Sequence, residues 1–129
     1  MTTPIQILCV DDDPDIRTIA VMALGLDPGI DVHAASSGAE ALSVLRNDAW
    51  RPDAVLLDVM MPVMDGLATL AAIRALDGHQ HLPVIFMTAR ARKEDLDSYR
   101  RQGATGVIVK PFDPLHLAED VRALIERRR

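Results

Sequence analysis

Short β-rich runs alternate with helical patterns five times along the chain, and this alternation constrains the fold more than any other feature. Three of the runs are continuously apolar (Ile-Leu-Cys-Val, Ala-Val-Leu-Leu and Val-Ile-Phe-Met), which is typical of strands covered on both faces of a parallel sheet. Because the connections are short, we expect right-handed crossovers and an α/β fold with one doubly wound parallel sheet between helices. The predicted strands are Ile5–Val10, Asp31–Ala35, Ala54–Leu57, Val84–Met87 and Gly106–Val109.

Start signals precede the helical patterns as well. They include capping side chains, capping-box spacing and prolines suited to a first turn. The predicted starts are Asp13-Pro14 for the first helix, Ser37 with Glu40 for the second, Asp65-Gly66 for the third and Asp113-Pro114 for the fifth.

The fourth helix, predicted at roughly Lys93–Gln102, differs from the others because Leu96 and Tyr99 are its only apolar residues. Gly103 is expected to stop this helix at its C-terminal end. A helix with so little apolar surface gains little from packing, so we expect this one to be held loosely.

Length and composition favour a single globular domain over residues 1–129, with no output domain after the fifth helix. The net charge of −5 gives no support for direct binding of nucleic acid. The chain also lacks an apolar stretch of membrane-spanning length and a secretory signal pattern. We therefore expect a cytoplasmic protein, with its single cysteine, Cys9, as a reduced thiol.

Polar residues follow or end four of the five predicted strands. Asp11 and Asp12 come after the first strand, Asp58 after the third, Thr88 after the fourth and Lys110 after the fifth. In a doubly wound sheet these positions share one edge, where function collects. Carboxylates brought together there repel one another unless a cation neutralises them, and hard oxygen ligands suit Mg²⁺. A lysine and a threonine hydroxyl beside them meet the needs of phosphoryl transfer, with a carboxylate as nucleophile.

Four motifs that contain these residues resemble the receiver domains of bacterial two-component response regulators. The order and spacing of the motifs are those of the family, and the resemblance covers essentially the whole chain. It implies a flavodoxin-like, three-layer sandwich with five strands in the order 2-1-3-4-5 and five helices. The motifs are Ile7-Leu8-Cys9-Val10-Asp11-Asp12-Asp13, Leu56-Leu57-Asp58-Val59-Met60-Met61-Pro62-Val63-Met64-Asp65-Gly66, Val84-Ile85-Phe86-Met87-Thr88-Ala89 and Val109-Lys110-Pro111-Phe112.

The resemblance also implies a role for each matching residue. Asp58 would be the phosphoacceptor, while Lys110 and Thr88 would contact the phosphoryl group. For Mg²⁺ the implied ligands are Asp12, Asp58 and the backbone carbonyl of Met60, with Asp11 acting mainly through a bound water. Pro111 would follow a cis peptide bond, the form that only proline adopts at low cost.

Implied partners are a sensor histidine kinase or histidine phosphotransfer protein, as donor of a phosphohistidine group, and an unknown downstream protein. On phosphorylation the domain would switch conformation and so control a partner or an output domain. The domain would be a monomer or weak dimer. It would assist its own phosphorylation and dephosphorylation without being an enzyme that acts on other substrates.

Two features depart from the usual pattern of the family. Val107 stands three residues before Lys110, where many receivers have an aromatic ring that turns inward when the threonine moves, so the coupling to the output face is in question. Met60 and Arg90 occupy the variable positions that flank the phosphoryl group, beside the small Ala89. Because a thioether cannot orient an attacking water and Arg90 can shield the phosphate, we expect slow self-hydrolysis.

Two other functions stay open at this point. Asp11-Asp12-Asp13 partly matches the Asp-x-Asp motif of Mg²⁺-dependent phosphohydrolases of the haloacid dehalogenase type, although that scheme leaves Asp58 without a role. Alternatively, the domain is an interaction module that works without phosphate, for which Val107 is the only support.

Overall fold

The computed structural model describes residues 3–47 and 49–128 of the chain. Within them, five parallel strands form one sheet in the order β2-β1-β3-β4-β5, with five α-helices. The strands are β1 (Ile5–Val10), β2 (Ile30–Ala35), β3 (Ala54–Asp58), β4 (Val84–Thr88) and β5 (Gly106–Val109). The helices are α1 (Pro14–Gly25), α2 (Gly38–Arg46), α3 (Gly66–Arg74), α4 (Lys93–Arg101) and α5 (Leu117–Arg128).

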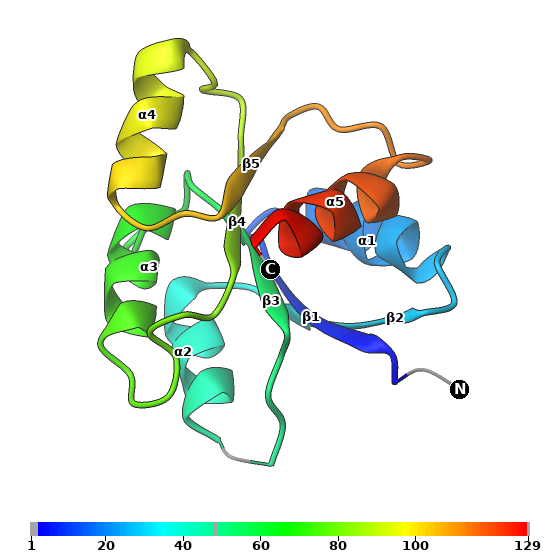
Figure 1. The fold of residues 1–129 in the computed structure, drawn as a ribbon, viewed down its shortest axis with the longest axis horizontal. Helices are drawn as coiled ribbons and strands as arrows, with labels where there is room; N and C mark the ends of the chain where they lie inside the picture. The colour runs from blue at the N-terminus through cyan, green and yellow to red at the C-terminus, as the bar shows by residue number, and fades with distance from the viewer. Residues whose placement is uncertain (1–2, 48, 129) are drawn as a thin grey trace.

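The helices lie in two layers on either side of the sheet (Figure 1). Helices α1 and α5 cover one face, and α2, α3 and α4 cover the other. This arrangement confirms the predicted flavodoxin-like, doubly wound fold and its strand order. The strand ends differ slightly from the prediction, since β2 begins one residue earlier and β3 and β4 include Asp58 and Thr88.

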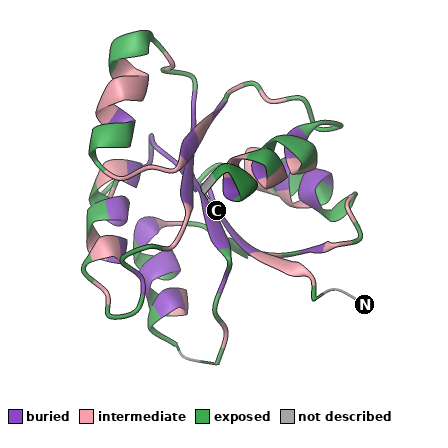
Figure 2. Cartoon of the chain, in the orientation of Figure 1, coloured by how far each residue is buried: buried purple, intermediate pink, exposed green. Residues whose placement is uncertain are grey.

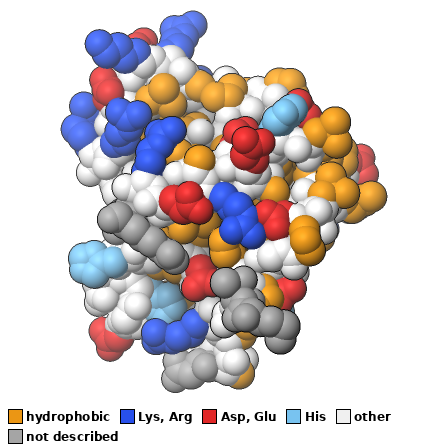
Figure 3. All heavy atoms as spheres, turned by 45° about the vertical axis from the view of Figure 1, so that its right-hand side comes forward, with side chains coloured by type: hydrophobic (Ala, Val, Ile, Leu, Met, Phe, Trp, Pro, Cys, Tyr) orange, Lys and Arg blue, Asp and Glu red, His pale blue; other side chains and the backbone are white. Residues whose placement is uncertain are grey.

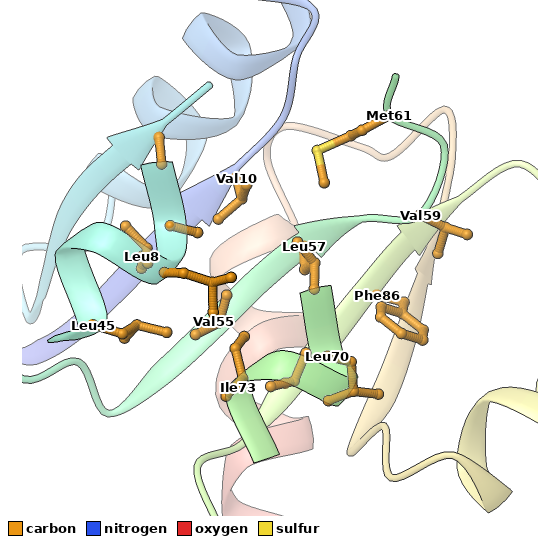
Figure 4. Close-up of a cluster of buried hydrophobic side chains, with 14 of the residues drawn as sticks. Leu8, Val10, Leu45, Val55, Leu57, Val59, Met61, Leu70, Ile73 and Phe86 are labelled. Atoms are coloured by element: carbon orange, nitrogen blue, oxygen red, sulfur yellow. The ribbon is translucent and has the colours of Figure 1, made fainter. Parts of the chain in front are cut away.

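The apolar runs supply both halves of the core because successive side chains of a strand point to opposite faces. Leu8 and Val10 of β1 face α2 and α3, while Ile7 and Cys9 of the same strand face α1 and α5. Figure 4 shows the first half, in which side chains of the sheet meet Leu70 and Ile73 of α3. The buried residues concentrate in the sheet, whereas α4 is mostly exposed or half-buried (Figure 2).

Side-chain caps begin the first three helices at the predicted residues. The Asp13 carboxylate accepts hydrogen bonds from the N–H groups of residues 15 and 16, and the Asp65 carboxylate accepts one from Ala68. The Ser37 hydroxyl accepts the Glu40 N–H at 3.0 Å, but the reciprocal half of the predicted capping box is replaced. The Glu40 carboxylate instead accepts the hydroxyl of Ser36 at 2.9 Å.

The predicted start of the fifth helix at Asp113-Pro114 is wrong, because α5 begins at Leu117. The Asp113 carboxylate accepts the Leu115 N–H, and its carbonyl accepts the His116 N–H. These bonds close a turn around Pro114 before the helix starts, so the aspartate organises a turn rather than a helix cap.

Helix α4 is the least buried of the three helices in its layer, as its composition predicts. Tyr99 is its one buried residue. The capping residue is Arg92, whose side chain has no acceptor, and the Asp95 carboxylate receives the Arg92 N–H at a long 3.3 Å. At the other end Gly103, with φ 106°, adopts the left-handed conformation and stops the helix as predicted.

Candidate functional site: an acidic cluster at the carboxyl edge of the sheet

The parallel ladder brings the predicted site residues to one edge. Asp58 and Thr88 are the last residues of β3 and β4, and Asp11 follows β1 directly. The Lys110 N–H donates to the Thr88 carbonyl at 2.9 Å, which continues the pairing of β5 with β4. The Lys110–Pro111 peptide bond is cis, the form that the family resemblance implies at this position.

A buried ion network forms the centre of the site. The Lys110 ammonium lies 3.1 Å from a carboxylate oxygen of Asp11 and 3.1 Å from Asp58 Oδ1. Asp11 is fully buried and Asp58 is 4% exposed, so solvent screens these charges weakly. The second oxygen of Asp11 accepts the Asp13 N–H at 3.0 Å. Within the described residues, the hydrogen bonds of Asp58 end on Oδ1, including a long 3.4 Å bond from the Met60 N–H, which leaves Oδ2 for other chemistry.

Burial and charge shift the acid–base properties of this cluster. Burial raises the pKa of Asp58 to about 6, helped by the Asp11 charge and opposed by the hydrogen bond from Lys110. Burial alone would lower the pKa of Lys110, but hydrogen bonds and charge from Asp58 and Asp11 outweigh it and raise this pKa. Desolvation, reinforced by the Asp11 charge, also raises the pKa of the nearby Cys9 thiol to about 12, so Cys9 stays protonated.

A divalent cation fits beside this network. Asp11, Asp12 and Asp58 each offer a carboxylate oxygen, and these oxygens lie within 4.8 Å of one another. Asp12 is exposed, so the cluster opens to solvent on one side. An all-oxygen ligand set with an open side suits Mg²⁺, which retains waters and prefers carboxylate ligands. The role of the Met60 carbonyl stays a prediction.

Thr88 sits on the sheet side of this edge. It is 1% exposed, and its hydroxyl accepts the Arg90 N–H at 2.9 Å. The next two residues along the chain, Ala89 and Arg90, are exposed. The threonine hydroxyl is therefore committed to its own loop in this state.

The loop from β3 to α3 is tight and shaped by backbone contacts. The Met64 N–H donates to the Pro62 carbonyl at 2.8 Å, across Val63 with φ 69°, an unusual conformation for a β-branched residue. A Cβ at Gly66 would stand 2.6 Å from the Asp58 carbonyl oxygen. A glycine there lets α3 begin directly against the acidic site.

Two residues that contact this site were not predicted from the sequence. The Arg17 guanidinium donates to the Asp11 carbonyl at 2.8 Å, and the Tyr99 hydroxyl donates to the Arg90 carbonyl at 3.2 Å. The position of Arg17 on the first helix, six residues after Asp11, could have suggested its contact. Nothing in the local pattern around Tyr99 indicates its partner.

An apolar hollow of about 340 Å³ adjoins the acidic cluster. Its lining includes Ile16 and Ile19 of α1, and Lys110 links it to the site. Ile19 is 46% exposed. Figure 3 shows hydrophobic side chains on the flank of the molecule that carries α1 and α5, while Lys and Arg side chains gather at the opposite upper corner.

Comparisons with known proteins agree with this geometry. The family model of the response regulator receiver domain matches residues 7–122. The transcriptional regulatory protein PrrA of Mycobacterium tuberculosis is 39% identical over 128 residues, which cover 99% of this chain and 52% of PrrA. The DNA-binding response regulator MtrA of Mycolicibacterium smegmatis is 35% identical, over 95% of this chain and 51% of its own. The chain thus spans about half the length of these curated relatives.

Solved structures agree as well. The chemotaxis protein CheY4 of Vibrio cholerae superposes with a TM-score of 0.85 at 32% identity, covering 95% of this chain and 99% of CheY4. A response regulator of Chloroflexus aurantiacus gives a TM-score of 0.85 at 30% identity, and the match covers 97% of this chain and 100% of that protein.

The fold and the acidic edge define a signalling domain of the CheY type. The chain belongs to the response regulator receiver domain family of two-component systems. Receiver domains are signalling modules rather than enzymes. No helix within residues 3–47 and 49–128 is long and apolar enough to cross a membrane.

Proposed function

We propose that this domain is a phosphorylation switch in which Asp58 accepts a phosphoryl group in a reaction that needs Mg²⁺. The observation that carries the proposal is the placement of the Asp58 carboxylate, which lies 3.1 Å from the Lys110 ammonium and shares its site with Asp11 and Asp12. A receiver that cannot be phosphorylated has no need for three converging carboxylates, whose mutual repulsion costs stability.

The reaction assigns a distinct task to each residue. An oxygen of Asp58 attacks the phosphorus of a phosphohistidine, the P–N bond breaks, and its electron pair returns to the imidazole, which takes up a proton. The product on Asp58 is a mixed carboxylic–phosphoric anhydride. Lys110 then pairs with a phosphoryl oxygen, and the Thr88 hydroxyl turns from the Arg90 N–H to donate to another.

Asp11, Asp12 and Asp58 would hold the Mg²⁺ ion, together with the Met60 carbonyl. When bound, the ion neutralises charge on the carboxylates and on the transferring phosphoryl group. Lys110 supplies the complementary positive charge from the protein, which explains why it is fixed between two acids before any phosphate arrives.

The donor is proposed to be a sensor histidine kinase or a histidine phosphotransfer protein. Such a protein must bring its imidazole to the exposed side of the acidic cluster. The apolar hollow between α1 and Pro111 lies on that approach and offers a surface for the donor. The phosphorylated domain then controls a downstream protein. Residues 1–129 act as one receiver unit, which assists its own phosphorylation and dephosphorylation and acts on no other substrate.

Acetyl phosphate with Mg²⁺ tests this proposal. The intact mass of the wild-type protein is expected to gain one phosphoryl group, and neither the Asp58→Asn variant nor a chelated sample gains one. An Asp97→Asn variant, altered at a half-buried acid on α4, serves as the matched control and retains the adduct. A folded wild-type protein without an adduct would contradict the proposal, whereas steady phosphate release by Asp58→Asn would indicate a hydrolase.

A further inference from the structure

The backbone of one residue, Arg90, joins the threonine of the site to the fourth helix. The Arg90 N–H donates to the Thr88 hydroxyl at 2.9 Å, and the Arg90 carbonyl accepts the Tyr99 hydroxyl at 3.2 Å. Both hydroxyl groups therefore bond the backbone of the same residue. The N–H and the carbonyl belong to the two planar peptide groups that meet at the Arg90 Cα, so a displacement of Arg90 affects both contacts.

Tyr99 is well placed to transmit such a shift. It is 6% exposed and is the buried residue of α4. Its ring packs edge-on against Phe86 of β4, with ring centroids 5.2 Å apart and an interplanar angle of 82°. A ring packed in this way cannot swing to the surface without opening a cavity, so a displaced hydroxyl must move the helix that carries it.

The two ends of α4 are held differently. At the C-terminal end, the Arg74 guanidinium donates to the Gly103 carbonyl at 2.9 Å and to the Leu82 carbonyl at 2.7 Å. At the N-terminal end, Arg92 provides no capping acceptor, and its N–H reaches Asp95 at 3.3 Å. Motion of the helix is thus expected as a pivot about residue 103, with the largest displacement near Lys93.

We propose that Tyr99 is a positioning residue that couples the orientation of the Thr88 hydroxyl to the placement of α4. In the unphosphorylated state the Thr88–Arg90–Tyr99 chain holds the helix against the sheet. When the Thr88 hydroxyl turns toward a phosphoryl oxygen, the Arg90 N–H loses its acceptor and the Arg90 carbonyl moves. The Tyr99 hydroxyl then either moves with the Arg90 carbonyl or loses its hydrogen bond to it, and in both cases the N-terminal end of α4 shifts.

This inference rests on the proposed phosphorylation of Asp58, and it also accounts for Val107. That valine is half-buried in β5 and packs against the same core cluster as Tyr99. The side chain that responds to the threonine is therefore supplied by α4 instead of β5. A purely structural Tyr99 would stabilise α4 equally in both states, whereas a coupling residue makes the stability of α4 depend on phosphorylation.

Hydrogen–deuterium exchange with mass spectrometry on the full chain separates these two roles. The samples are wild type, Tyr99→Phe and Ser98→Ala, each with Mg²⁺ and with or without acetyl phosphate, and intact mass records the adduct in every sample. Ser98→Ala is the matched control. It also removes a hydroxyl from α4, but this hydroxyl accepts a hydrogen bond from the Gln102 side chain and does not contact Arg90.

Phosphorylation of wild type and Ser98→Ala is expected to speed amide exchange in residues 93–99 about fivefold, the effect of losing one hydrogen bond. Tyr99→Phe is expected to acquire the same adduct, to exchange at the fast rate before phosphorylation and to show no further response. Two results would overturn the inference and leave the proposed function intact. One is a fully phosphorylated Tyr99→Phe whose amide exchange in residues 93–99 still speeds up as in wild type; the other is a phosphorylated wild type whose exchange does not change. A wild-type protein without an adduct would overturn the proposed function beneath it.

Discussion

The acidic edge of the sheet and helix α4 lie on either side of Thr88, but the edge is firmly held by burial and ion pairs, whereas α4 has few stabilising contacts. Asp58 and Thr88 belong to strands whose every residue is buried, and Lys110 is fixed to its partners at 3.1 Å. Helix α4 buries one side chain and has a poorly capped start, although α1, α2 and α3 each have a capping carboxylate or hydroxyl. Phosphoryl chemistry requires fixed groups, whereas a signal requires a part that moves at low cost. The domain places these two properties next to each other.

The largest effect should come from the fixed side of the comparison. We expect Lys110→Met to slow phosphorylation by acetyl phosphate by about 100-fold, because it removes the preorganised positive charge opposite the reacting oxygen. The same variant should lose about 3 kcal/mol of stability near pH 7 without Mg²⁺, because two buried carboxylates lose their partner. Single-turnover kinetics and urea unfolding measure the two effects.

Lys110→Arg is the control for Lys110→Met, since it retains the charge and should recover most of the stability. A Lys110→Met protein that reacts at the wild-type rate would show that the fixed ammonium is unimportant for the chemistry.

A matched pair of leucines compares the two regions by packing alone. Leu70 of α3 is 1% exposed, whereas Leu96 of α4 is half-buried. We expect Leu70→Ala to cost about 3 kcal/mol in the free energy of unfolding and Leu96→Ala about 1 kcal/mol or less, since the cost follows the burial and the cavity left behind. Chemical denaturation of both variants tests this difference. Equal losses would mean that α4 is packed as firmly as α3.

Asp58 should make the stability depend on pH in a particular direction. Its pKa in the folded protein is raised to about 6, so the folded state binds this proton more tightly than the unfolded state does. The contribution of protonated Asp58 to the stability of the folded state is fully present below about pH 4 and is lost as the pH rises through about 6. Asp58→Asn should therefore be more stable than wild type near pH 7 without Mg²⁺, by about 1 to 2 kcal/mol, and equal to it near pH 4.

Urea unfolding at the two pH values, with chelator present, measures this change. An Asp58→Asn protein that is less stable than wild type near pH 7 would indicate that the Lys110 hydrogen bond, and not burial, dominates the environment of Asp58.

The smallest predicted effect concerns the phosphoryl lifetime. Met60 is exposed beside Asp58 and offers no group to orient an attacking water. We expect slow dephosphorylation in wild type and acceleration by about tenfold or less in Met60→Gln, whose amide can position a water. Met22 on α1 is similarly exposed, so Met22→Gln is the control. A wild-type lifetime of only seconds, followed by intact mass after removal of acetyl phosphate, would contradict this expectation.

Residues whose environment is set by the strand pattern could be predicted from the sequence. The apolar runs fixed the sheet and placed Asp11, Asp58, Thr88 and Lys110 at one edge, because the ends of parallel strands must meet there. The charge composition of α4 likewise predicted its shallow burial. These predictions depend only on the periodicity of side chains along regular elements.

Contacts between loops and distant side chains could not be predicted in the same way. The Asp113 turn delays α5 because a local hydrogen bond competes with helix initiation. The Tyr99–Arg90 bond depends on the approach angle of α4, which no local pattern encodes. Arg74, which holds the Gly103 carbonyl across 29 residues, is a further case. Such contacts follow from the packed structure, and here they connect the acidic edge of the sheet to α4.

The most direct test of the account is to locate the phosphoryl group itself. Phosphorylated protein would be reduced with borohydride, which converts an aspartyl phosphate to homoserine, and then mapped by peptide mass spectrometry. The account predicts homoserine at position 58 and unmodified aspartates at positions 11 and 12. Homoserine at either of those positions, or a phosphoryl group on a residue that resists reduction, would contradict it.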